Sequence, residues 1–167
     1  MDSEGLRALQ APLKQRYREH PELALVTLRA NGELGAGVTC SVRTGRALAE
    51  AGLHPASGGD GLTLCSGDML LEALAACAGV TMRAVATSLG IPVAGSVRVE
   101  GDLDFRGTLA VDRAVPVGFE QIRVTFDLES DASDEELARL LDLTRRYCVV
   151  FQTLARTPDL SFAYSGE

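Results

Sequence analysis

The feature that most constrains this chain is a long apolar segment near its middle. From Ser66 to Leu89 the sequence is dominated by Ala, Leu and Val. Ser66 belongs to the residue types preferred at helix N-caps, and Gly90 followed by Pro92 is typical of a helix end. The pattern predicts a helix over residues 66–89 that is apolar nearly all round. Such a helix must be buried on several sides.

We do not expect this segment to span a membrane. Between Glu72 and Arg83 it has only ten uncharged residues, whereas a bilayer requires roughly 20. No basic segment followed by an apolar one opens the chain, so we predict no secretory leader and a cytoplasmic location. The net charge of −7 argues against nucleic acid and against an anionic membrane surface as partners.

The flanking segments alternate between helical and extended patterns. Before the central helix we predict a helix over residues 5–19, which Pro12 kinks or shifts. A strand over 22–30, a hairpin turn at Asn31-Gly32 and a returning strand over 35–43 are expected to follow it. A long loop over 47–65 then leads to the central helix. After it we predict strands within 93–111 and over 118–129, a helix behind a capping box at Ser133–Glu136, a second helical segment over 148–155 after a break near Tyr147, and a last strand over 159–164.

Strands that cluster apart from helices favour an α+β fold with antiparallel sheets around the central helix. Without an internal repeat or a low-complexity linker, we predict a single domain over residues 1–167, with residues 1–21 as a helical extension. An apolar central helix also suggests that a second subunit completes the core.

The chain has four cysteines: Cys40, Cys65, Cys77 and Cys148. None forms a CxxC motif, and neither histidine is next to a cysteine pair, so zinc spacing is absent. Cys40 is predicted on a strand, where packing is the expected role. Cys65 lies roughly 15–18 Å from Cys77 along a helix, too far for a disulfide within one subunit.

Cys77 lies at the middle of the apolar helix, and two interpretations remain open for it. A free cysteine is usually buried and inert. A reactive one would require a cation or several hydrogen-bond donors, because burial alone raises a thiol pKa. The candidate cations are four arginines: Arg43, Arg46, Arg145 and Arg146.

Cys148 and His54 also leave alternatives. Cys148 begins a helical segment, where exposed N–H groups lower a thiol pKa, but it is equally compatible with a core cysteine. His54, in the loop before the central helix, is either a pocket residue or a solvated or capping side chain.

Two stretches resemble a known family. Ser66–Met82 (SGDMLLEALAACAGVTM) is similar to the central helix of the OsmC/Ohr family, and Arg146–Leu154 (RYCVVFQTL) to its second cysteine helix. The order of the elements is similar along nearly the whole chain.

The resemblance implies an OsmC-like intertwined homodimer, with two sheets around paired central helices. It further implies a thiol-dependent peroxidase without metal, haem or other cofactor. Cys77 would attack a small organic hydroperoxide, Cys148 would close a disulfide with it, and an external dithiol would reduce that disulfide.

Two positions depart from the family's pattern. Family members usually have Asn-Pro-Glu before the helix, where this chain has Ser66-Gly67 followed by Asp68; Asp68 is a candidate substitute, although by helical angle it points away from Cys77. The usual Cys-Pro is Cys148-Val149 here, which loses the fixed φ of proline. Arg43 and Arg46 are the positional candidates for the activating arginine. The alternative functions are a non-catalytic small-molecule-binding protein and a redox-sensing stress protein on the same fold.

Overall fold

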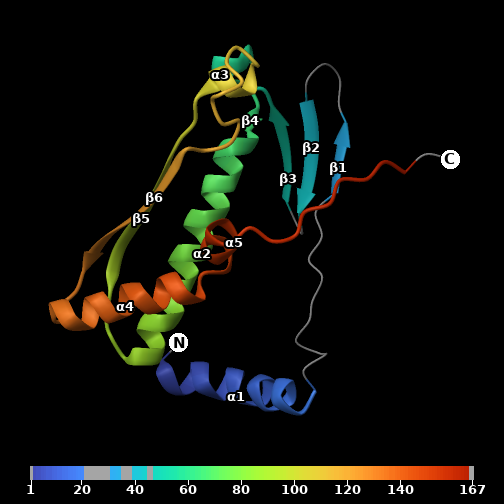
Figure 1. The fold of residues 1–167 in the computed structure, drawn as a ribbon. Helices are drawn as coiled ribbons and strands as arrows, with labels where there is room; N and C mark the ends of the chain where they lie inside the picture. The colour runs from blue at the N-terminus through green and yellow to red at the C-terminus, as the bar shows by residue number, and fades with distance from the viewer. Residues whose placement is uncertain (1, 21–30, 35–38, 45–46, 166–167) are drawn as a thin grey trace.

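The computed structural model describes residues 2–20, 31–34, 39–44 and 47–165 (Figure 1). The predicted strand over 22–30 and the turn residues 45–46 lie outside these ranges. The elements in chain order are α1 (Ser3–Glu19), β1 (Asn31–Leu34), β2 (Thr39–Thr44), β3 (Ala47–Gly52), the 3₁₀ helix η2 (Pro55–Ser57), β4 (Leu64–Cys65), α2 (Ser66–Leu89), β5 (Ala94–Asp102), α3 (Phe105–Thr108), β6 (Gln121–Glu129), α4 (Asp134–Tyr147) and α5 (Val149–Ala155).

The central helix α2 has the predicted bounds. Its N-cap is Cys65 rather than the predicted Ser66, and Gly90 ends it in the left-handed conformation at φ 71°. Only glycine adopts that conformation without a steric cost, so the stop is encoded locally. By length and composition alone α2 is able to cross a membrane, a test that core helices of soluble proteins also pass.

Among the described residues, the fully buried side chains of α2 form a single stripe. Leu74, Ala78, Met82 and Ala86 recur every fourth residue and are buried. Val80, on another face, is 72% exposed. The described residues therefore bury one stripe of α2 fully and its neighbouring faces, which contact α1, α4 and α5, only in part.

The buried stripe packs on a two-stranded antiparallel hairpin formed by β5 and β6. Val97 lies opposite Phe126 and Val99 opposite Val124 in its ladder. These side chains contact the buried cluster around Leu74. Figure 1 shows this hairpin on one side of α2 and the sheet of β1 to β4 on the other, with α1 crossing near the end of α2. The predicted α+β fold with a long central helix is confirmed.

The first sheet differs from the prediction at two places. Asn31 and Gly32 are in β1, paired with Arg43 and Val42, so they are not the predicted hairpin turn. Part of the predicted loop 47–65 forms two strands: β3, which pairs antiparallel with β2, and the short β4, which pairs parallel with β3. A sequence as poor in β-branched residues as ALAEAG becomes a strand because its neighbours supply the hydrogen bonds.

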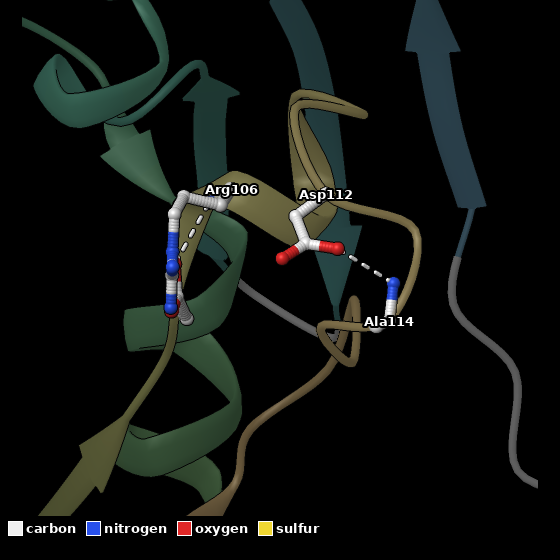
Figure 2. A network of polar contacts seen from close by, with 4 residues as sticks. Arg106, Asp112 and Ala114 are labelled. Atoms are coloured by element: carbon white, nitrogen blue, oxygen red, sulfur yellow. Dashed lines mark hydrogen bonds and ion pairs between the residues drawn. The ribbon is translucent and has the colours of Figure 1, made fainter.

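After β5 the chain forms a short helix where the sequence pattern predicted more strand. Asp104 caps α3 by accepting a hydrogen bond from the Arg106 backbone N–H at 2.9 Å, and its carboxylate pairs with the Arg106 guanidinium. In the following turn, shown with Arg106 in Figure 2, Asp112 accepts from the Ala114 N–H at 2.9 Å. These local bonds compete successfully with extension of the strand.

The C-terminal helices form as predicted, but the last strand does not. Ser133 and Glu136 form the capping box of α4. The break before α5 falls at Cys148, whose extended backbone has φ −72° and ψ 109°. Residues 159–164 are not a strand, and the Phe162 side chain in this segment is fully exposed. The described sheets offer no pairing partner there.

Candidate active site

The two predicted redox cysteines come together in the structure. Cys77 lies on α2 and packs against the buried cluster that contains Cys148, at the junction of α4 and α5. Cys148 is only 1% exposed and belongs to a buried cluster with Leu74 and Ala78, against which Cys77 packs. A partly exposed sulfur thus contacts a buried one.

The break between α4 and α5 explains how Cys77 gains its hydrogen bonds. The first N–H groups of a helix have no partner within that helix. The backbone N–H groups of Val149 and Val150 at the start of α5, and the Thr81 hydroxyl from the next turn of α2, all act to lower the pKa of Cys77. The donors to Cys77 therefore come from two elements: the backbone at the start of α5 and the Thr81 hydroxyl on α2 itself.

The balance of these interactions favours the thiolate of Cys77. Burial acts to raise the pKa of Cys77, but hydrogen bonds from Val150, Cys148, Val149 and Thr81 together hold it below its ordinary value. These donors stabilise the charged form, which is the nucleophile. They are neutral groups, so the lowering does not depend on a neighbouring cation.

The pKa of Cys148 moves in the opposite direction. Burial raises the pKa of Cys148, and the hydrogen bond and negative charge of Cys77 raise it further, against the lowering effect of the backbone of Phe151 and Val150. At neutral pH the pair therefore consists of an activated sulfur and a protonated partner, which is the order required for one thiol to react before the other.

One contributor was missed at the sequence level. From the sequence alone, valine at the position of the family's proline indicates only the loss of a fixed φ. Valine also brings a gain, because the backbone N–H of Val149, which proline lacks, acts to lower the pKa of Cys77. The presence of valine where the family usually has proline is the sequence feature that could have predicted this additional donor.

Of the predicted supporting residues, only Asp68 has a side chain within the described part of the chain, and it lies away from the thiols. Asp68 is exposed in the first turn of α2, and nine residues place it on the opposite helix face from Cys77. Arg43 is on β2, and Arg46 lies outside the described residues. Their supporting roles remain predictions.

Arg145 and Arg146 also interact away from the Cys77 sulfur. Arg145 pairs with Asp142 at 3.3 Å, and the Arg146 guanidinium lies over the Tyr147 ring at 5.6 Å. Neither contributes to the lowered pKa of Cys77.

The remaining candidates have structural positions. Cys65 caps α2 through its backbone, and Cys40 is on β2, as its strand prediction required. His54 accepts a hydrogen bond from the Ala56 N–H at 3.0 Å and stacks on Phe105, so it is a capping residue. Among the described residues, no group of His, Cys, Asp or Glu could hold a metal ion.

A cavity of about 340 Å³ lies on the Cys148 side of the pair, and we call it the Cys148 cavity. Aromatic and aliphatic side chains form most of its wall, with Asp142 and Arg145 as the charged members. Its lining residues are Ala78, Val124, Phe126, Leu141, Asp142, Thr144, Arg145, Cys148 and Phe151.

Solved structures share this fold at low sequence identity. An OsmC-like protein from Mycoplasma pneumoniae has a TM-score of 0.66 at 17% identity, over 79% of this chain and 89% of that one. An organic hydroperoxide resistance protein OsmC, also called a predicted redox protein, from Legionella pneumophila has a TM-score of 0.58 at 20% identity, over 78% and 90%. OhrB of Bacillus subtilis, an organic hydroperoxide resistance protein, has 0.50 at 17%, over 79% and 93%.

The fold and the site together define an α+β protein with a thiol pair beside a long central helix. The OsmC-like protein family matches residues 58–163, which include α2 and both thiols. The chain belongs to the OsmC family. No curated protein matches it.

Proposed function

We propose that this protein is a thiol-dependent peroxidase that reduces organic hydroperoxides in the cytoplasm. The family includes proteins named for organic hydroperoxide resistance, which supports a peroxide-linked role. The observation that carries the proposal is the packing of Cys77 against the cluster that contains Cys148, at a place where the donors around Cys77 hold its pKa below the ordinary value.

The reaction begins with attack of the Cys77 thiolate on the outer oxygen of the hydroperoxide. The O–O bond breaks, Cys77 becomes a sulfenic acid, and the alkoxide takes a proton to leave as the alcohol. The Cys148 sulfur then attacks the Cys77 sulfur, which releases the hydroxyl as water and forms the Cys77–Cys148 disulfide. The peroxide has gained two electrons, and the two thiols have lost them.

An external dithiol completes the cycle. One of its thiolates attacks the disulfide to give a mixed disulfide, and its second thiol releases the protein in the dithiol form. The external dithiol loses two electrons in this exchange and is itself oxidised to a disulfide. The chain itself needs no metal, haem or organic cofactor for these steps, and we propose that it acts as a homodimer.

The geometry supports the order of attack. Cys77 is partly exposed and has the lowered pKa, so it is the first to meet peroxide. Cys148 is buried and protonated, which protects it from direct oxidation, and it is already in contact with the sulfur that it must attack. Little rearrangement is therefore required to form the disulfide.

Peroxide consumption tests the proposal directly. The reduced protein is mixed with cumene hydroperoxide and dithiothreitol, and loss of peroxide is followed for wild type, Cys77→Ser and Cys65→Ser. We expect Cys77→Ser to abolish consumption and Cys65→Ser, the matched control, to retain it. Unchanged turnover by Cys77→Ser would contradict the mechanism.

The Cys148 cavity favours one alternative, a protein that binds a small apolar molecule without chemistry. Its wall is largely aliphatic and aromatic, and its volume of about 340 Å³ suits a small ligand. Native mass spectrometry of the purified protein distinguishes the two functions. A co-purified ligand together with no peroxide-dependent disulfide would support binding alone.

A further inference from the structure

The Cys148 cavity adjoins a larger hollow formed by α4, α5 and the residue after α5, which we call the arginine hollow. Its volume is about 810 Å³, and its lining residues are Asp142, Leu143, Arg145, Arg146, Phe151, Gln152, Ala155 and Arg156. Asp142, Arg145 and Phe151 line both cavities. A largely apolar space that ends at Cys148 thus lies next to a space with charged walls.

The arginine hollow has an excess of positive charge. Three guanidinium groups face one carboxylate there, and Asp142 already pairs with Arg145 at 3.3 Å. Among the described residues, Arg146 and Arg156 have no carboxylate partner, and the Arg146 guanidinium lies over the Tyr147 ring instead. Because the whole chain has a net charge of −7, the hollow is a local site of attraction for an anion that the rest of the molecule repels.

The chemistry of the Cys77–Cys148 disulfide determines which sulfur a reducing thiolate attacks. Thiol–disulfide exchange is faster when the sulfur that leaves has the lower pKa. The donors around Cys77 lower its pKa, whereas burial raises the pKa of Cys148. A reducing thiolate is therefore expected to bond to the Cys148 sulfur and to expel Cys77 as the thiolate.

The position of the Cys148 cavity agrees with this direction of attack. Cys148 lines the cavity and is only 1% exposed, so a reductant has to enter a cavity to reach it. The cavity's volume of about 340 Å³ suits a small molecule. Cys77 is partly exposed and is not among the residues that line this cavity. Oxidation at Cys77 and reduction at Cys148 therefore use different approaches to the pair.

We propose that the external dithiol is a small anionic molecule that enters the Cys148 cavity, with its anionic group bound by Arg146 and Arg156, and attacks the Cys148 sulfur. This proposal rests on the proposed peroxidase function, whose reductant it specifies. The S–S bond breaks, its electron pair leaves with Cys77, and Cys148 is joined to the dithiol. The second thiol of the dithiol loses its proton and attacks the dithiol sulfur of this mixed disulfide, and Cys148 leaves and takes up a proton. The dithiol has lost two electrons, and the two cysteines have gained them.

The attacked sulfur is identified by trapping with a monothiol, which stops at the mixed disulfide. The Cys77–Cys148 disulfide is formed with diamide, and Cys40 and Cys65 are blocked with iodoacetamide. The protein is then treated briefly with 2-mercaptoethanesulfonate, and the released thiol is labelled with N-ethylmaleimide. We expect peptide mass mapping to find the mercaptoethanesulfonate adduct on Cys148 and the maleimide on Cys77. The reverse distribution would overturn the proposal.

The role of the arginines is tested with two vicinal dithiols, the anionic meso-2,3-dimercaptosuccinate and the neutral 2,3-dimercaptopropanol. Their rate constants for reducing the diamide-oxidised protein are compared between wild type and the double variant Arg146→Gln/Arg156→Gln. We expect about a tenfold loss with dimercaptosuccinate at low salt, less than about a twofold loss with dimercaptopropanol, and a smaller difference at about 1 M salt.

The matched control is Arg113→Gln/Arg139→Gln, which changes the net charge equally at two exposed positions that do not line the hollow. We expect this control to retain the wild-type rate constants with both dithiols. Equal losses in the two double variants, or equal losses with the two dithiols, would overturn the binding role of Arg146 and Arg156. Unchanged melting temperatures verify that both variants are folded.

Oxidation by diamide separates this proposal from the peroxidase function, because it forms the disulfide without peroxide. If cumene hydroperoxide forms no disulfide but the adduct maps to Cys148 and the arginine dependence is found, the peroxidase function is wrong and the route of reduction stands. If peroxide is consumed but the adduct maps to Cys77 and Arg146→Gln/Arg156→Gln has no effect, the proposal is overturned and the peroxidase function stands.

Discussion

Substitution of Val149 by proline tests the origin of the reactivity of Cys77. Val149 is the first residue of α5, where proline is well tolerated, and Cys148 before it has the extended conformation that a following proline requires. The Val149 side chain is 69% exposed, so its replacement disturbs little packing. The substitution thus removes one N–H donor to the Cys77 thiolate and little else.

The expected magnitude follows from the lost hydrogen bond. A hydrogen bond to a charged group is worth about 1.5–3 kcal/mol, and 1.36 kcal/mol corresponds to roughly one pKa unit. Because Cys77 is partly exposed, water replaces part of the lost bond, so we expect the pKa of Cys77 to rise by about one unit, at the lower end of this range. Below the pKa, the thiolate fraction and the alkylation rate should fall about tenfold.

The assay is the pH dependence of iodoacetamide alkylation, resolved by peptide mass mapping so that Cys77 is followed separately from the other cysteines. Val149→Ala is the matched control, because it alters the side chain and keeps the N–H. Equal titration curves for Val149→Pro and Val149→Ala would refute the argument that the start of α5 activates Cys77.

Three further predictions concern the second thiol and the stability of the fold. Cys148→Ser should leave the Cys77 sulfenic acid without a partner, so a dimedone adduct at Cys77 should accumulate after peroxide; its absence would contradict the resolving role. Leu140→Ala should lower the free energy of unfolding by about 2–5 kcal/mol in urea titrations, because Leu140 is fully buried, whereas Leu62→Ala, at an exposed position, should change it by less than about 0.5 kcal/mol. Ser133→Ala should cost about 1 kcal/mol through loss of the α4 cap, seen as a lower melting temperature.

The parts of the fold that the sequence predicts are those with local signals. The bounds of α2 follow from an apolar segment closed by Gly90, and the start of α4 follows from the Ser133–Glu136 capping box, both of which act within one helical turn. Asn31-Gly32 misleads because its turn preference is weaker than the ladder that pairs it with β2. The strand β3 is invisible locally because its neighbours, not its side chains, specify it.

In the candidate site, too, the sequence predicts the residues with local signals but not the contacts that depend on packing. Cys77 and Cys148 could be selected from the sequence, since both occur in recognisable helical stretches. Their contact could not, because it depends on how α5 packs on α2. The effects of the Val149 N–H and the Thr81 hydroxyl on the pKa of Cys77 depend on the same packing. No residue pattern in the sequence predicts either effect.

The central claim is that Cys77 and Cys148 form one redox pair, and the most direct measurement is disulfide mapping after a single equivalent of cumene hydroperoxide. The reduced protein is treated, alkylated and digested, and the linked peptides are identified by mass spectrometry. We predict one intramolecular disulfide joining Cys77 to Cys148, with Cys65 still alkylated. Peroxide consumption that leaves Cys77 and Cys148 both as thiols, or that links either of them to Cys65, would contradict it.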